Sequence, residues 1–274
     1  MTSTLDASKP DLAAIKQRQQ QTWASGDFAV VAARIVLVAE QLADAADLHA
    51  GWRVLDVATG SGNAAIAAAR LGAEAVGIDY VPALLDRARE RVAAERLDVR
   101  LAEADAHSLP FGDGEFDAVT SVFGVMFAAD PMRAARELVR VVRPRGTIAL
   151  ASWTPTGFIG EMFGVMTAHV PSLVRVPSPF VWGTEPGLRS LLAPDMAYLQ
   201  LRKRTFTFRA RSPEHFVETF ARSYGPTVRA LDAAGPNRFL LEQDLVDLVR
   251  QRNRLGDGAV SIPATYLEAI ATRR

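Results

Sequence analysis

The sequence predicts an α/β fold built on a doubly wound, mostly parallel sheet. Apolar strand-like runs alternate strictly with helix-like runs, a glycine-rich turn follows the first run, and an acidic residue ends the second. This alternation is typical of parallel sheets with crossover helices. The expected strands cover 53–57, 75–79, 98–103, 117–122 and 146–152, and the helices between them cover 63–71, 82–95 and 131–142.

The N-terminal segment predicts two helices before the first strand. Residues 8–24 are polar and rich in glutamine, and we expect a helix that ends near Trp23. A break follows, in which Asp27 is a suitable N-cap for a second helix extending to about Leu48. Trp23 and Phe28 belong either to a flap that closes on a ligand or to a hydrophobic staple between the two helices.

The first strand, turn and helix have the layout of a nucleoside-binding βαβ unit. Gly60 and Gly62 permit positive φ and place no Cβ between the backbone and a ligand. The helix after them is almost entirely Ala and Ile, so it can pack closely on the sheet. Asp79 ends the second strand, at the edge where open α/β sheets bind ligands.

The chain after Trp153 predicts a lid or cap over that edge. Residues 158–170 have helical apolar spacing, and Pro171, Pro177, Pro179 and Pro186 punctuate the segment that follows. We expect a strand over 198–208, amphipathic helices over 213–233 and 237–254, and a last strand over 264–272. The predicted division is an N-terminal helical flap (1–50), a nucleoside-binding core (51–153), and lid helices with closing strands of the same domain (154–274).

Composition narrows the function classes. The 274 residues are 49% hydrophobic, and 31 basic residues balance 31 acidic ones, which gives no general electrostatic case for nucleic acid or an anionic membrane as partner. No run of about 18 apolar residues predicts a membrane span, and the first residues do not resemble a signal peptide. Cysteine is absent, which excludes disulfides and cysteine nucleophiles. We therefore expect a cytoplasmic protein without a metal site.

Two classes of nucleoside ligand fit the glycine-rich turn, and Asp56 distinguishes between them. Gly60-x-Gly62-x-x-Ala65 matches a relaxed NAD(P) fingerprint. A carboxylate at position 56, however, would repel a pyrophosphate that needs a bare helix N-terminus. It would attract a ligand that carries an ammonium and a sulfonium group. An NAD(P)-dependent oxidoreductase remains the alternative, although only three lysines could supply a catalytic Tyr/Lys pair.

The motif Asp56-x-Ala58-x-Gly60-x-Gly62 is similar to that of class I S-adenosylmethionine (SAM) methyltransferases. From residue 52 to about 165 the chain resembles the ubiquinone/menaquinone-biosynthesis C-methyltransferases, with a methyltransferase type 11-like domain. It departs from their pattern at Arg145, where glycine is common, and at 125–127, where Leu-Arg-Asn is usual. The matching stretches are 54–63, 77–80, 103–111, 116–119, 121–124, 137–138 and 143–146.

This resemblance implies a Rossmann-like, seven-stranded sheet with the last strand antiparallel, plus N-terminal helices and a helical lid. It also implies a role for each matching residue. Asp56 would contact the methionine ammonium, and Asp79 would bind the ribose hydroxyls. The remaining implied cofactor contacts are Ala58, Gly60, Ser61 and Gly62 around the amino-acid part, Tyr80, Asp105 and Ala106 around the adenine, and Val122 and Phe123 near the methionine and methyl.

The predicted reaction is methyl transfer from SAM to a small, apolar or aromatic acceptor. The apolar residues Met126, Phe127, Phe158, Met162, Phe163 and Met166 either line a substrate pocket or form a packed helix face. His107 is the candidate general base, with a structural loop histidine as the alternative reading. Enzymes that methylate amino groups of DNA carry an (Asp/Asn)-Pro-Pro-aromatic motif after the fourth strand. Residues 122–125 of this chain do not match that motif, which argues against nucleic acid as the methyl acceptor. A SAM-binding protein without turnover is the third possibility.

Overall fold

The computed structural model describes residues 11–171, 178–256 and 258–274. Its centre is a seven-stranded sheet with the order β3-β2-β1-β4-β5-β7-β6. Strands β1 to β5 pair in parallel, whereas β7 runs antiparallel to both β5 and β6. The predicted fold class, with an antiparallel last strand, is confirmed. The strand bounds are Arg53–Val57, Glu74–Asp79, Val99–Glu103, Phe116–Val122, Val142–Trp153, Met196–Ala210 and Val260–Arg273 for β1 to β7.

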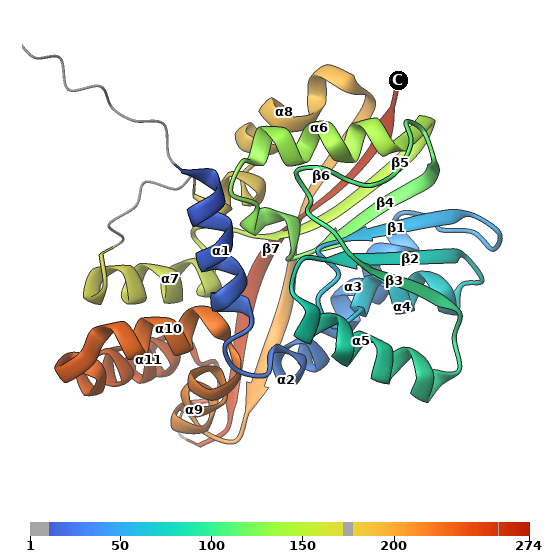
Figure 1. Cartoon of the computed structure of the whole chain (residues 1–274). Coiled ribbons are helices and arrows are strands. Elements are labelled where there is room, and N and C mark those ends of the chain that lie inside the picture. The colour runs from blue at the N-terminus through green and yellow to red at the C-terminus, as the bar shows by residue number, and fades with distance from the viewer. Residues whose placement is uncertain (1–10, 172–177, 257) are drawn as a thin grey trace, which may run out of the picture.

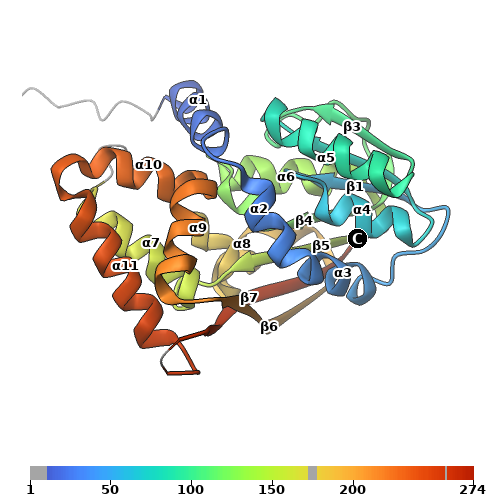
Figure 2. The same cartoon turned by 90° about the horizontal axis from the view of Figure 1, so that it is seen from below.

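Helices cover both faces of the sheet, as the crossover connections require. On one face lie α3 (Val36–Ala45), α4 (Asn63–Arg70) and α5 (Pro82–Glu95); on the other lie α6 (Pro131–Val141) and α8 (Glu185–Leu192) (Figures 1 and 2). Strand β1 is therefore buried on both sides, which explains its apolar sequence. Within the described part of the chain, no helix is long and apolar enough to cross a membrane.

The cap helices gather beyond the strand ends, beside α1 (Leu12–Trp23) (Figure 1). They are α7 (Phe158–His169), α9 (Pro213–Ser223), α10 (Gly225–Ala234) and α11 (Arg238–Arg252). Helix α1 packs against α10. Asp11 caps α1 by accepting from the amides of Ala13 and Ala14, and the predicted residues before position 11 lie outside the described residues.

Two of the predicted helices are each broken in the structure. The expected helix from Asp27 to Leu48 consists of α2 (Phe28–Ala32), a 3₁₀ turn (Ala33–Ile35) and α3. The break lets α2 pack on α9 while α3 packs on α4. The expected helix over 213–233 is divided at Tyr224, whose backbone is extended, and α10 begins with Pro226 in its first turn. Proline lacks an N–H and would clash with the preceding turn of a continuous helix, which accounts for this break.

Helix α8 was missed because it begins in the proline-punctuated segment. The side chain of Thr184 accepts from the Gly187 amide, and Pro186 occupies the first turn, where proline is favourable. Pro177, one of the prolines that punctuate this segment, lies outside the described residues.

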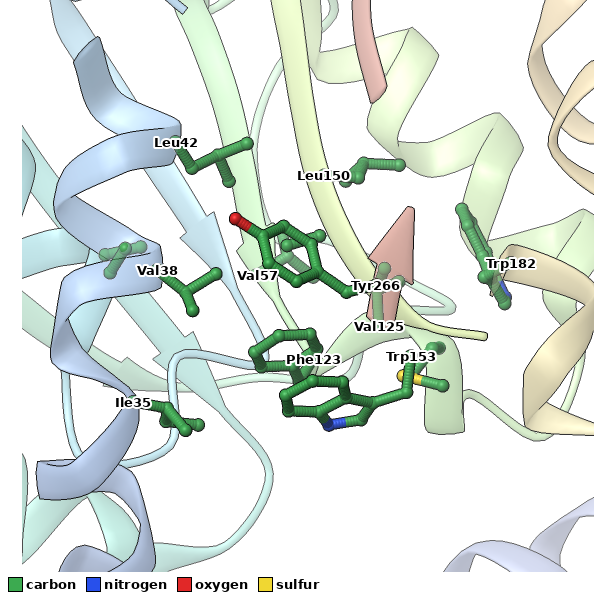
Figure 3. Packing of buried hydrophobic residues seen from close by; sticks show 14 of the residues in the cluster. Ile35, Val38, Leu42, Val57, Phe123, Val125, Leu150, Trp153, Trp182 and Tyr266 are labelled. Carbon is green, nitrogen blue, oxygen red and sulfur yellow. The ribbon is translucent and has the colours of Figure 1, made fainter. Parts of the chain in front are cut away.

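The apolar core is continuous from the sheet into the cap. Phe123 at the end of β4 stacks on Trp153 at the end of β5, with ring centroids 3.7 Å apart, and Tyr266 of β7 meets both rings edge-on (Figure 3). Figure 3 also shows Val38 and Leu42 of α3 approaching these rings from the side. The strand ends are thus held in fixed positions by aromatic packing.

Candidate functional site

A pocket of about 920 Å³, including its open mouth, lies at the carboxyl ends of β1, β2 and β4. The structure brings ten of the eleven predicted cofactor residues to its wall: Asp56, Ala58, Gly60, Ser61, Asp79, Tyr80, Asp105, Ala106, Val122 and Phe123. Gly62 is the exception. It is the N-cap of α4 with φ +88°, and a Cβ there would lie 3.2 Å from that of Ala88. Its role is close packing between α4 and α5.

The turn between β1 and α4 is tightly wound. Gly60 has φ +55°, and Ala58 has φ +54°, which is strained for a residue with a Cβ. The next loop presses against it, because a Cβ on Gly124 would lie 2.3 Å from the Ala58 carbonyl oxygen. Phe123 also has positive φ, +56°. Two strained loops, from neighbouring strands, therefore form one side of the pocket.

Arg91 of α5 holds the same turn and was not predicted from the sequence. Its Nη1 donates to the Ser61 carbonyl oxygen at 2.7 Å and to Asn63 Oδ1 at 2.6 Å. Asn63 in turn donates to the Ala32 carbonyl oxygen. The polar side chains of the turn are thus tied to α5 and α2. One arginine among many in a helix gives no sequence signal for this role.

Asp56 is buried at the floor of the pocket. Its carboxylate accepts from Thr59 Oγ1 at 2.5 Å, Thr120 Oγ1 at 3.0 Å and the Ala65 amide at 3.2 Å. Burial raises its pKa to about 7, against these hydrogen bonds. Asp56 therefore caps the first turn of α4 and lines the pocket at once.

Asp79 is the second buried acid. Its oxygens accept from the amides of Gly60 and Val81, both at 2.9 Å. Burial raises its pKa to about 6. Among the described residues, no cation contributes to the shift of either Asp56 or Asp79. The pocket therefore contains two buried carboxyl groups without a countercharge.

Asp105 and His107 form a linked pair at the rim. Asp105 accepts from the His107 amide at 2.9 Å and from His107 Nδ1 at 2.6 Å. His107 Nε2 accepts from the Asp130 amide at 2.9 Å, which assigns the proton to Nδ1. Both ring nitrogens are therefore engaged, and His107 has no lone pair for a general base. This geometry supports the structural reading of His107.

Helix α1 crosses the mouth of the pocket and bonds to three parts of its rim. Lys16 Nζ donates to Asp105 Oδ2 at 2.5 Å, Gln19 to the Phe127 carbonyl oxygen at 2.9 Å, and Gln20 to the Tyr80 carbonyl oxygen at 2.5 Å. Burial tends to raise the pKa of Asp105, but hydrogen bonds from His107 and Lys16 hold it well below its usual range. Lys16 and Gln19 were not predicted as site residues, although a polar helix before the core was a usable signal.

The predicted apolar group divides between core and pocket. Met126, Phe158, Met162 and Met166 are buried in the core, so the packed-face reading holds for them. Phe127 lines the pocket, and its ring centroid lies 4.8 Å from that of Trp23. Trp23 also meets Phe28 edge-on at 5.5 Å. Trp23 of α1 and Phe28 of α2 both line the pocket. Their contact therefore closes the pocket and also holds the two helices together.

Comparison with known proteins places this pocket in a family. A model for the methyltransferase domain matches residues 55–150, the segment from β1 to β5 that builds the site. The chain belongs to the class I SAM-dependent methyltransferases. This methyltransferase is 41% identical to the demethylmenaquinone methyltransferase of Deinococcus radiodurans over 126 residues, which cover 44% of this chain and 52% of that protein.

The similarity to an uncharacterized protein of Mycobacterium tuberculosis extends over nearly the whole methyltransferase. The two are 37% identical over 263 residues, which cover 94% of this chain and 95% of the relative. The crystal structure of the YcgJ protein from Bacillus subtilis shares the fold, with a TM-score of 0.60 at 18% identity, covering 86% of this chain and 97% of that one. The similarity to the mycobacterial protein therefore includes the cap as well as the core.

Proposed function

We propose that the pocket binds SAM and that the enzyme transfers its methyl group to a small, apolar or aromatic acceptor. The observation that carries this proposal is the pair of buried carboxyl groups, Asp56 and Asp79, without a countercharge. Burying unpaired charge is costly. A ligand with an ammonium group would supply the missing charge, whereas a pyrophosphate would add two more negative charges to the same pocket.

The proposed contacts follow the position of each residue along the pocket. Asp56 receives the methionine ammonium, and the backbone from Ala58 to Ser61 surrounds the amino-acid part. Asp79 binds the ribose hydroxyls, since each of its oxygens keeps a free lone pair beside one backbone bond. Tyr80, Asp105 and Ala106 face the adenine, and Val122 and Phe123 lie toward the methyl.

When bound, SAM would supply an electrophilic methyl group, with its sulfur as the leaving group. The protein's task is then to align the acceptor and to exclude water. The engaged ring of His107 is consistent with a reaction in which positioning, rather than a dedicated base, provides the rate enhancement. We propose His107 as a positioning residue that ties the 105–108 loop to the start of α6.

The first test is calorimetric titration with S-adenosylhomocysteine (SAH). We expect the wild type to bind SAH and the Asp79→Asn variant, which keeps the side-chain shape, to bind it at least tenfold more weakly because a charge-assisted hydrogen bond to the ribose is lost. Asp86→Asn, an exposed acid on α5, is the control and should bind like the wild type. Equal affinity in all three proteins, or binding of NAD(P) instead, would overturn the site.

Turnover is tested separately with methyl-labelled SAM and small-molecule cell extract. Label transferred to an extract component supports the enzyme. SAH binding without any labelled product would favour a SAM-binding protein that lacks turnover.

A further inference from the structure

A second cavity adjoins the proposed SAM pocket. Its empty space is about 330 Å³ including the open mouth, and no charged residue stands among its eleven described lining residues. Eight of the eleven are aromatic: Trp23, Phe28, Phe123, Phe127, Trp153, Phe208, Phe220 and Tyr224. The other three are Val31, Ile35 and Ile159. We call this cavity the aromatic chamber.

The chamber and the SAM pocket share a wall. Five residues line both: Trp23, Phe28, Ile35, Phe123 and Phe127. The wall includes Phe123, which the family resemblance places near the transferred methyl. A molecule in the chamber would therefore lie next to the methionine end of the cofactor rather than its adenine end.

The far wall comes from the cap. Ile159 is on α7, Phe208 on β6, Phe220 on α9, and Tyr224 joins α9 to α10. The family model ends at residue 150, before all four. The part of the chain with the least resemblance to quinone-biosynthesis enzymes thus shapes the chamber, which gives the cap a role in acceptor choice.

The aromatic walls are preformed. The Trp153 ring lies 6.0 Å from Phe208, Phe208 lies 5.8 Å from Phe220, and Phe220 lies 5.4 Å from Tyr224, as centroid distances. Tyr224 also contacts Trp23, with ring centroids 5.7 Å apart. Rings already held by edge-to-face and tilted contacts offer faces and edges to another flat ring at little entropic cost.

Tyr224 is the polar group of the far wall. Its side chain is buried, and burial is the only cause that raises its pKa, with no charge or hydrogen bond contributing among the described residues. The hydroxyl is therefore neutral over the physiological range and serves as a hydrogen-bond donor. A phenol hydroxyl at the wall of an apolar cavity is well suited to bond an oxygen on the chamber's ligand.

We propose that the aromatic chamber holds the methyl acceptor, and that this acceptor is an uncharged, flat aromatic molecule with an oxygen that Tyr224 can contact. This assignment rests on the proposed function. A charged group would be desolvated there without a partner.

The test is equilibrium dialysis of the full chain with 2-naphthol, with and without saturating SAH. We expect wild-type protein to bind 2-naphthol, and to bind the anion 2-naphthoate and the cation benzyltrimethylammonium at least tenfold more weakly. Ile159→Phe should fill the chamber and reduce 2-naphthol binding at least tenfold while SAH affinity stays unchanged. Tyr224→Phe should weaken 2-naphthol about fivefold and leave naphthalene unaffected. Phe239→Ala, exposed on α11, is the matched control.

Several results would overturn the proposal: no binding of 2-naphthol, equal binding by Ile159→Phe, or tighter binding of either charged probe. Tighter binding of the cation in particular would indicate that the chamber is an ammonium-binding aromatic cage. Failure of SAH to bind would count against the proposed function instead. The dialysis without SAH still tests the chamber in that case, because its walls do not depend on the cofactor.

Discussion

At the scale of single residues, the site depends on acids that the protein keeps from solvent. Asp56 and Asp79 are 2% and 4% exposed, and burial is the largest cause of both raised pKa values. The sequence predicted these positions from the ends of two strands. In the structure each acid also serves the fold, Asp56 by capping α4 and Asp79 by holding the Gly60 amide. Substitution at either position therefore affects both binding and structure.

Cofactor binding should release protons. A bound ammonium group favours the ionised form of Asp56, whose pKa is about 7, and of Asp79, whose pKa is about 6. Near pH 6.5 the free pocket carries protons on these groups that the complex loses. We expect SAH affinity to weaken as the pH falls from 8 to 6.

Calorimetry at pH 6.5 in buffers of different ionisation enthalpy measures this release directly. The observed enthalpy should change with the buffer in the wild type, and less so in Asp56→Asn. An enthalpy that is the same in every buffer would show that the two acids do not respond to the ligand.

At the scale of elements, α1 acts as a strap across the pocket. Three side chains on it bond to the rim at Asp105, Tyr80 and Phe127. Lys16 occupies an oxygen of Asp105 that the resemblance assigns to the adenine amino group. Periodicity could predict that α1 is a helix, but not that it returns over residues about 90 positions later, because that contact depends on the tertiary fold.

Removing the Lys16 contact should speed SAH association. The ion pair is partly exposed, with 27% and 37% of the two side chains accessible, so its contribution is modest. Exposed pairs contribute about 0.2–1 kcal/mol, which corresponds to an association rate about 1.4- to fivefold higher for Lys16→Ala. Stopped-flow measurements should also show a rate that rises with salt in the wild type and not in the variant.

The matched control is Lys203→Ala, an exposed lysine on β6 that is absent from both cavities. If Lys16→Ala and Lys203→Ala associate with SAH at the wild-type rate, then α1 does not limit entry to the pocket.

At the scale of the whole molecule, the sequence predicted the core far better than the cap. From β1 to β5 each strand and helix is found within a few residues of its predicted position, because the motif and the apolar alternation are local signals. The errors lie where long-range contacts decide. The break between α2 and α3 accompanies their packing on α9 and α4, and the aromatic chamber combines residues from Trp23 to Tyr224. Pocket residues could be predicted from a motif; the chamber, assembled by tertiary packing, could not.

The same two acids should make the stability of the whole protein depend on pH and on ligand. Their pKa values in the folded protein, about 7 and 6, exceed the value of 3.8 expected in the unfolded chain. Between pH 4 and 7 the folded state thus binds more protons, so their contribution is present at low pH and is lost as the pH rises through 6 and 7. From pH 6 to pH 8 this loss is on the order of 1–2 kcal/mol for the cofactor-free protein.

Urea unfolding measures this loss as the difference between the wild type and Asp56→Asn. Without ligand, the variant should gain stability relative to the wild type as the pH rises from 6 to 8, because it has one carboxyl fewer to ionise in a buried site. With saturating SAH the wild type should recover, since the bound ammonium offsets the buried charge and the ligand stabilises the folded state by mass action. Parallel pH profiles for the two proteins, with and without SAH, would mean that Asp56 is ionised in the free enzyme and already balanced. The electrostatic argument for a cationic ligand would then fail for the molecule as a whole.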